Sequence, residues 1–177
     1  PDPLAPGSYT LFAKADGPGA VSETNEFNNT RFWFIQIGPD LVLTGLSGPS
    51  IAGAGGTITI ADTTANQGLG AAAASVTRFY LSADLSLDAN DVLLQSRSVP
   101  ALTANTSSSA NNSVTIPANT ADASYFLIAK ADAPGAVAES NETNNTRTLT
   151  LRIGPDLTVA SATAPASGGT RPSCSTC

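Results

Sequence analysis

The chain has 177 residues, enough for one or two small domains. A hydrophobic fraction of 41% can supply a core, while 14 acidic residues outnumber 8 basic ones and give a net charge of −6. This balance excludes the basic surface that nucleic-acid binding needs. Because no run reaches about 18 apolar residues, we also expect no membrane span.

One stretch of the sequence occurs twice. Residues 8–43 (SYTLFAKADGPGAVSETNEFNNTRFWFIQIGPDLVL) align with residues 124–159 at a constant offset of 116, and 23 of 36 positions are identical. A fixed period indicates tandem repeats. We therefore assign residues 1–37 to the last two strands of one repeat, 38–153 to a complete repeat, and 154–177 to the first strand of a following repeat plus a tail.

Short runs of alternating apolar and polar residues, separated by Gly, Pro, Asn and Ser clusters, predict an all-β fold. The complete repeat contains seven such runs, with a polar loop (ALTANTSSSANN) before the fifth and a predicted edge strand as the fourth. The seven predicted strands are Asp40–Leu46, Thr57–Asp62, Ser75–Ser82, Val92–Ser98, Ser113–Ile116, Ser124–Ala131 and Thr146–Ile153. Seven strands in a repeat of this length predict an immunoglobulin-like antiparallel β-sandwich.

The repeat also predicts which side chains face the core. Tyr125, Leu127, Ala129 and Ala131 match the first copy without change, so we place them inward. The alternate positions differ between copies and are expected to face outward. Outward aromatic and aliphatic residues favour an interface between modules or subunits, and the residues predicted for it are Phe12, Phe32, Phe34, Tyr80, Phe126 and Ile128.

The two ends of the chain hold only parts of a sandwich. An isolated hairpin is marginally stable in water, and its open edges invite further pairing. We therefore expect partners that are neighbouring repeats or copies of the chain itself, including strand addition at the chain ends. The short Gly38–Leu41 and Gly154–Leu157 junctions (both GPDL) predict limited hinge freedom between modules.

Two motifs resemble the CARDB family, the cell-adhesion-related domains found in bacteria and archaea. One is FYLSADLSLDANDVLL, residues 79–94; the other is the Y-x-L-x-A-x-A-D…V-x-E-x-N-E-x-N-N pattern, residues 125–145. The resemblance covers residues 38–153 and the matching part of 1–37. It implies an immunoglobulin-like sandwich used in tandem on bacterial or archaeal surface or secreted proteins, without catalytic residues.

Two acidic loops could supply the oxygen ligands that calcium takes. The first candidate set is Asp132, Glu139, Asn141, Glu142 and Asn145; the second is Asp84, Asp88 and Asp91. Neither follows the spacing of a standard calcium loop. Asn and Asp side chains also stabilise turns by binding backbone amides, and that structural role remains the competing interpretation for both loops. Apart from this calcium hypothesis, no cofactor is predicted.

The sequence argues against an enzyme. It contains no His, so Ser-His-Asp and Cys-His arrangements are absent, and no Gly-rich phosphate loop precedes a helix. Cys174 and Cys177 lack the further ligands of a zinc site. We predict a structural or adhesive module of an extracellular filament, stalk or cell-surface protein. The alternative is a calcium- or carbohydrate-binding accessory module of a secreted enzyme.

Overall fold

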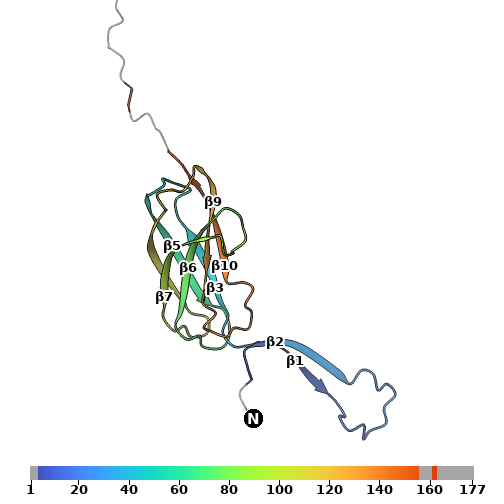
Figure 1. Cartoon of the computed structure of the whole chain (residues 1–177). Coiled ribbons are helices and arrows are strands. Elements are labelled where there is room, and N and C mark those ends of the chain that lie inside the picture. Colours follow the sequence, from blue (N-terminus) through green and yellow to red (C-terminus); the bar gives the residue numbers. More distant parts are fainter. Residues whose placement is uncertain (1–3, 156–160, 163–177) are drawn as a thin grey trace, which may run out of the picture.

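The protein combines a projecting hairpin with a β-sandwich (Figure 1). The computed structural model describes residues 4–155, 161 and 162, and within these residues it contains strands but no helix. Accordingly, no described segment could cross a membrane as a helix. Of residues 154–177, predicted to be the first strand of a following repeat plus a tail, the described residues include only Gly154, Pro155 and positions 161–162. Both cysteines lie outside the described residues.

The hairpin pairs β1 (Gly7–Lys14) with β2 (Thr30–Ile37), and the sandwich follows after a three-residue link. One sheet has the order β3-β5-β8, formed by Leu41–Ser47, Thr57–Asn66 and Ser107–Thr115. The other has the order β4-β10-β9-β6-β7, formed by Ile51–Ala52, Thr146–Ile153, Ala123–Lys130, Ser75–Ser82 and Val92–Val99. All pairs are antiparallel except β4 with β10. The all-β, immunoglobulin-like sandwich is therefore confirmed.

The strand count and several boundaries differ from the prediction, and β5 continues to Asn66 where the prediction ends at Asp62. The sandwich has eight strands, because β4 adds two residues alongside β10. The prediction of a polar loop through Ser107–Asn112 is wrong, since these residues begin β8 and pair with β5 along its length. Strand β8 lies at the edge of its sheet, where alternating Ser and Asn side chains can meet solvent. The predicted edge strand, β7, does lie at a sheet edge.

The core fills the space between the two sheets. Its inward residues include Leu127 and Ala129 of β9 and Ala131 directly after it, as predicted, together with Phe79 of β6 and Leu41 of β3. Ile128 was expected to be exposed, and that expectation is wrong: it is 1% exposed. It belongs to neither core cluster. Ile128 lies in a central strand directly opposite Tyr80 and Thr148, and a side chain with cross-strand neighbours on both sides is less exposed than alternation along its own strand predicts.

A buried ion pair joins the two sheets near their open edge. Arg97 of β7 donates from Nη2 to Asp62 Oδ2 of β5 at 2.6 Å and from Nε to the same oxygen at 3.1 Å. Asn112 of β8 donates to the other Asp62 oxygen at 2.7 Å. Because both carboxylate oxygens have donors, the charge of Asp62 is compensated inside the fold.

Candidate functional site

The projecting hairpin has the same backbone construction as β9–β10 of the sandwich. Tyr9 pairs with Ile35 as Tyr125 pairs with Leu151, and this register holds along both hairpins at the offset of 116. The connecting loops also agree. Asp16 and Asp132 both have positive φ, and each accepts a hydrogen bond from a valine amide five residues later. The sequence repeat is therefore a structural repeat at the level of the hairpin.

The two hairpins differ in what covers them. Leu11 is 54% exposed, whereas its counterpart Leu127 is completely buried in the core. In the loop, Val21 is 61% exposed and its counterpart Val137 only 6%. The face of β1–β2 that corresponds to a core face is thus open, and Trp33 (57% exposed) and Ile35 lie on it as well.

The opposite face of the hairpin carries an aromatic cluster. The ring centroids of Phe12 and Phe32 are 6.1 Å apart, and those of Phe32 and Phe34 are 5.6 Å apart in an edge-on arrangement. All three rings are exposed. The predicted interface set therefore separates into two groups, because Tyr80, Phe126 and Ile128 lie on the five-stranded sheet, where the first two are half-buried and Ile128 is buried.

The link between hairpin and sandwich is held by the last residue of β5 and by the loop that follows it. Asn66 Oδ1 accepts a hydrogen bond from the Asp40 amide at 3.0 Å, while Gln67 donates its amide to the Asp40 carbonyl at 2.8 Å. Gly70 donates its amide to the Gly38 carbonyl at 3.0 Å. A Cβ added at Gly68 or Gly70 would lie within 2.5–2.8 Å of the link backbone, so this approach requires glycine.

The Asn-rich loop between β9 and β10 holds the same link from the other side. Ser140 donates its amide to the Pro39 carbonyl at 2.8 Å, and Asn144 Nδ2 donates to Asp40 Oδ1 at 3.0 Å. Glu139 Oε2 accepts the Leu41 amide. We call Glu139, Ser140, Asn144 and Asn145 the junction clamp, because together they fix the start of β3.

Glu139 is a nearly buried carboxyl group at the centre of this clamp. Its second oxygen accepts a hydrogen bond from Asn145 Nδ2 at 2.8 Å. Removal from solvent raises the pKa of Glu139 to about 7, and the nearby charges of Glu142 and Asp132 act in the same direction. The hydrogen bonds from Leu41 and Asn145 oppose this rise in pKa.

The side chains proposed as calcium ligands accept hydrogen bonds from backbone amides, except that of Asn145, which donates to Glu139. Asp132 Oδ2 accepts the Val137 amide at 2.8 Å, Glu142 Oε1 accepts the Glu139 amide at 2.9 Å, and Asn141 Oδ1 accepts the Thr143 amide at 3.1 Å. In the second set, Asp84, Asp88 and Asp91 each accept an amide within their exposed loop. Among the described residues, no three acidic, His or Cys side chains gather as a metal site would require.

The sequence model of the CARDB family matches residues 38–149, which is more than half of the chain. The chain belongs to the CARDB family. Among solved structures it is similar to the CARDB domain of the PF1109 protein from Pyrococcus furiosus, which was crystallised in complex with di-metal ions. The identity is 22% over 66% of this chain and 89% of that one, with a TM-score of 0.51. At this identity the likeness establishes the fold alone.

A second similar structure is the 272–376 domain of a protein from Methanosarcina acetivorans that is provisionally named a cell surface protein. The identity is 24% over 68% of this chain and 96% of that chain, with a TM-score of 0.49. No curated protein sequence matches the chain.

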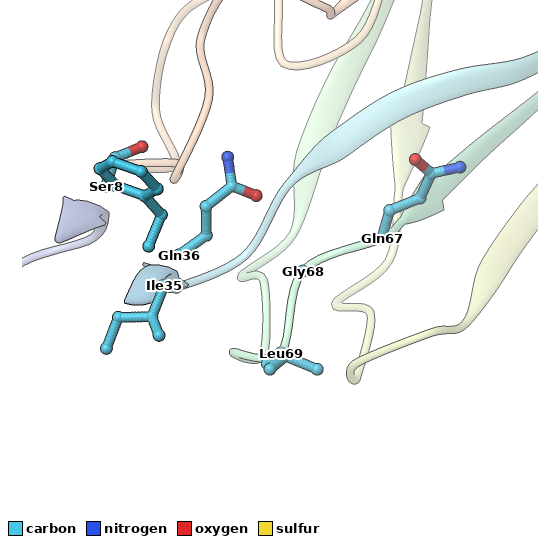
Figure 2. A pocket seen from close by; sticks show the side chains of 8 residues that line it. Ser8, Ile35, Gln36, Gln67, Gly68 and Leu69 are labelled. Carbon is cyan, nitrogen blue, oxygen red and sulfur yellow. The ribbon is translucent and has the colours of Figure 1, made fainter. Parts of the chain in front are cut away.

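A cavity lies where the hairpin meets this CARDB sandwich (Figure 2). Its volume is about 600 Å³, and Ser8, Ile35 and Gln36 of the hairpin face Gln67, Gly68 and Leu69 of the loop after β5. Phe34 and Gly38 complete the lining. No acidic or basic side chain lines it, so its walls offer apolar surface and neutral hydrogen-bonding groups.

The junction clamp is the functional feature that sequence reasoning missed. In the sequence, Glu139 and Asn145 indicate only calcium ligands or turn residues. One signal was present: the acidic Asn-rich loop and the GPDL motif recur together in both copies. Asn66 gave no signal, because it occurs once and its five hydrogen bonds depend on tertiary packing.

Proposed function

We propose that this chain is part of an extracellular or surface-associated protein in which CARDB sandwiches act structurally, by packing module against module. The observation that carries the proposal is the β1–β2 hairpin, which has the register of β9–β10 but leaves its core face open. Such a hairpin is suited to be the last two strands of another sandwich. The extracellular setting follows from what membership of the CARDB family implies.

The held link supports a mechanical role. Six hydrogen bonds from the end of β5 and from two loops fix residues 38–41, as described above, and three residues separate β2 from β3. Two modules joined in this way have little hinge freedom. We propose no catalytic activity, since the sequence contains no His and the cavity at the junction has no titratable lining residue.

A fusion built from this chain tests the proposal. Residues 38–122 are placed directly before residue 7, so that β1–β2 can act as the last hairpin of an added sandwich. Trp33 is the only tryptophan, and its counterpart Leu149 packs against the core. We expect the emission of Trp33 to move to shorter wavelength and to become shielded from a soluble quencher, relative to the original chain.

The matched control is the same fusion with Phe79→Asp in the added half alone, which should prevent the added sandwich from folding and leave Trp33 exposed. If Trp33 stays equally exposed in both fusions, the hairpin is not a module terminus and the proposal fails.

Calcium binding is the second candidate function. It is favoured by the di-metal ions in the similar PF1109 domain and by the acidic residues around Glu139. In that case the chain would serve as an accessory module of a secreted enzyme, binding calcium or carbohydrate.

A further inference from the structure

The loop at the tip of the hairpin forms a second cavity, of about 430 Å³. Its lining residues are Glu23, Thr24, Asn25, Asn28 and Asn29. At the offset of 116 these correspond to Glu139, Ser140, Asn141, Asn144 and Asn145, which include every member of the junction clamp. The protein therefore contains two versions of the same loop, and among the described residues only the loop between β9 and β10 holds the start of a strand.

The occupied version shows what the loop binds. It takes an extended Pro-Asp-Leu segment through three contacts: the Ser140 amide to the Pro39 carbonyl, Asn144 Nδ2 to the Asp40 carboxylate, and the Leu41 amide to Glu139. Two of these contacts read backbone groups. The contact from Asn144 Nδ2 instead binds the carboxylate of an aspartate, which gives the loop a preference for one residue type.

The unoccupied version already has the required shape. The Glu23 amide donates to Glu26 Oε1 at 2.9 Å, as the Glu139 amide does to Glu142 Oε1. Asn25 accepts the Phe27 amide as Asn141 accepts the Thr143 amide. The Ala15 amide bonds the Asn29 carbonyl as the Ala131 amide bonds that of Asn145, both at 2.9 Å. Little reorganisation is needed before binding, which lowers its free-energy cost.

The sequence supplies a matching strand. Gly154, Pro155, Asp156 and Leu157 repeat Gly38–Leu41 without change. The hairpin projects from one end of the sandwich, while the described chain that follows β10 leaves from the opposite end (Figure 1). A second copy can supply it.

We propose that residues 23–29 of one copy bind residues 154–157 of a second copy. Thr24 donates its amide to the Pro155 carbonyl, Asn28 binds the Asp156 carboxylate, and Glu23 accepts the Leu157 amide. This inference rests on the proposed function, and it names the partner of the same hairpin. Because the two surfaces lie at opposite ends of the molecule, the contact is heterologous and extends into a line of copies.

Peptide binding tests the site directly. A peptide of residues 154–160 (GPDLTVA) is titrated into the full chain carrying ¹⁵N, and backbone amide shifts are followed by NMR. We expect saturable shifts at residues 21–29. The same peptide with its aspartate replaced by alanine should bind at least about tenfold more weakly, since it cannot form the hydrogen bond between a carboxylate and Asn28.

Sedimentation of the full chain tests the partner. We expect the average mass to rise with concentration, and Asp156→Ala and Glu23→Gln each to reduce that rise. Asp88→Asn is the control, because it removes a carboxylate from an exposed loop that contains neither residues 23–29 nor residues 154–157. Excess GPDLTVA peptide should also return the chain to monomers.

Two results would overturn this inference. One is the absence of shifts at residues 21–29 with millimolar peptide. The other is self-association that persists in Glu23→Gln and Asp156→Ala, which would indicate a different surface such as the aromatic cluster. If Trp33 becomes buried in the fusion while the peptide fails to bind, the proposed function stands and only the contact between copies is rejected.

Discussion

Glu139 illustrates how one side chain can fix a junction and respond to pH. Both of its oxygens accept hydrogen bonds, from the Leu41 amide and from Asn145, in a site nearly closed to water. Removal from water favours the neutral carboxyl group, whereas the two hydrogen-bond donors favour the ionised one. The pKa is raised to about 7, so removal from water has the larger effect. At neutral pH, burying the ionised carboxylate of Glu139 in the clamp therefore costs free energy.

The pKa of Glu139 determines the sign of its effect on stability. Between pH 4.5 and about 7 the folded state binds more protons at this group than the unfolded state does, so the free energy of unfolding falls as the pH rises. We expect a decline of no more than about 3 kcal/mol. In Glu139→Gln this part of the decline should disappear, because glutamine does not titrate.

Urea unfolding at pH 4.5 and pH 7.5 measures the effect. Asp122→Asn, an exposed acid outside the clamp, should retain the pH dependence of the original chain. An equal pH dependence in Glu139→Gln and in the original chain would show that another group is responsible.

At the scale of the elements, the sequence predicted the features that depend on the alternation of apolar and polar residues along a strand and on the repeat. The inward set on β9 follows from the period-2 pattern and the offset of 116, and the predicted edge strand β7 lies at a sheet edge. The polar strand β8 could not be predicted in this way, because its pairing with β5 is decided by tertiary contact. The burial of Ile128 likewise depends on neighbours in other strands.

The candidate site was predicted only in part, for the same reason. The aromatic face of the hairpin could be deduced from alternation, since Phe12, Phe32 and Phe34 are indeed exposed together. The clamp could not, because the partners of Glu139 and Asn144 lie about 100 residues away in the sequence. Local spacing carries no information on such a contact.

The ion pair between Arg97 and Asp62 joins the two sheets at β7, and we expect it to contribute to stability. Arg97→Leu should lower the free energy of unfolding by about 3–5 kcal/mol, since it leaves a buried carboxylate with only the neutral donor Asn112. Arg152→Leu, an exposed arginine on β10, should change it by less than about 0.5 kcal/mol. Equal losses in urea unfolding would mean that the pair contributes nothing specific.

The double variant Arg97→Leu with Asp62→Leu separates charge from packing. Removing both charges should recover much of the loss, because the single change is costly mainly through the unpaired carboxylate. A double variant as unstable as Arg97→Leu would instead attribute the loss to packing.

At the scale of the whole molecule, the two candidate functions differ in what calcium does. A ligand that binds the folded state must raise its melting temperature. Because the carboxylates of Asp132, Glu139 and Glu142 already accept backbone amides, we expect millimolar calcium to leave the melting temperature unchanged relative to magnesium at equal ionic strength. A calcium-specific rise that Asp132→Asn abolishes would favour the accessory-module function.

The path of the chain through the sandwich has a consequence under tension. β3 begins at the end that carries the hairpin, and β10 finishes at the opposite end (Figure 1). A pulling force would therefore run along the strands, across ladder bonds that lie perpendicular to it. Bonds loaded in this direction share the load and must break together, whereas strands peeled from one end lose their bonds in succession. The fold is thus oriented to resist stretching along its long axis.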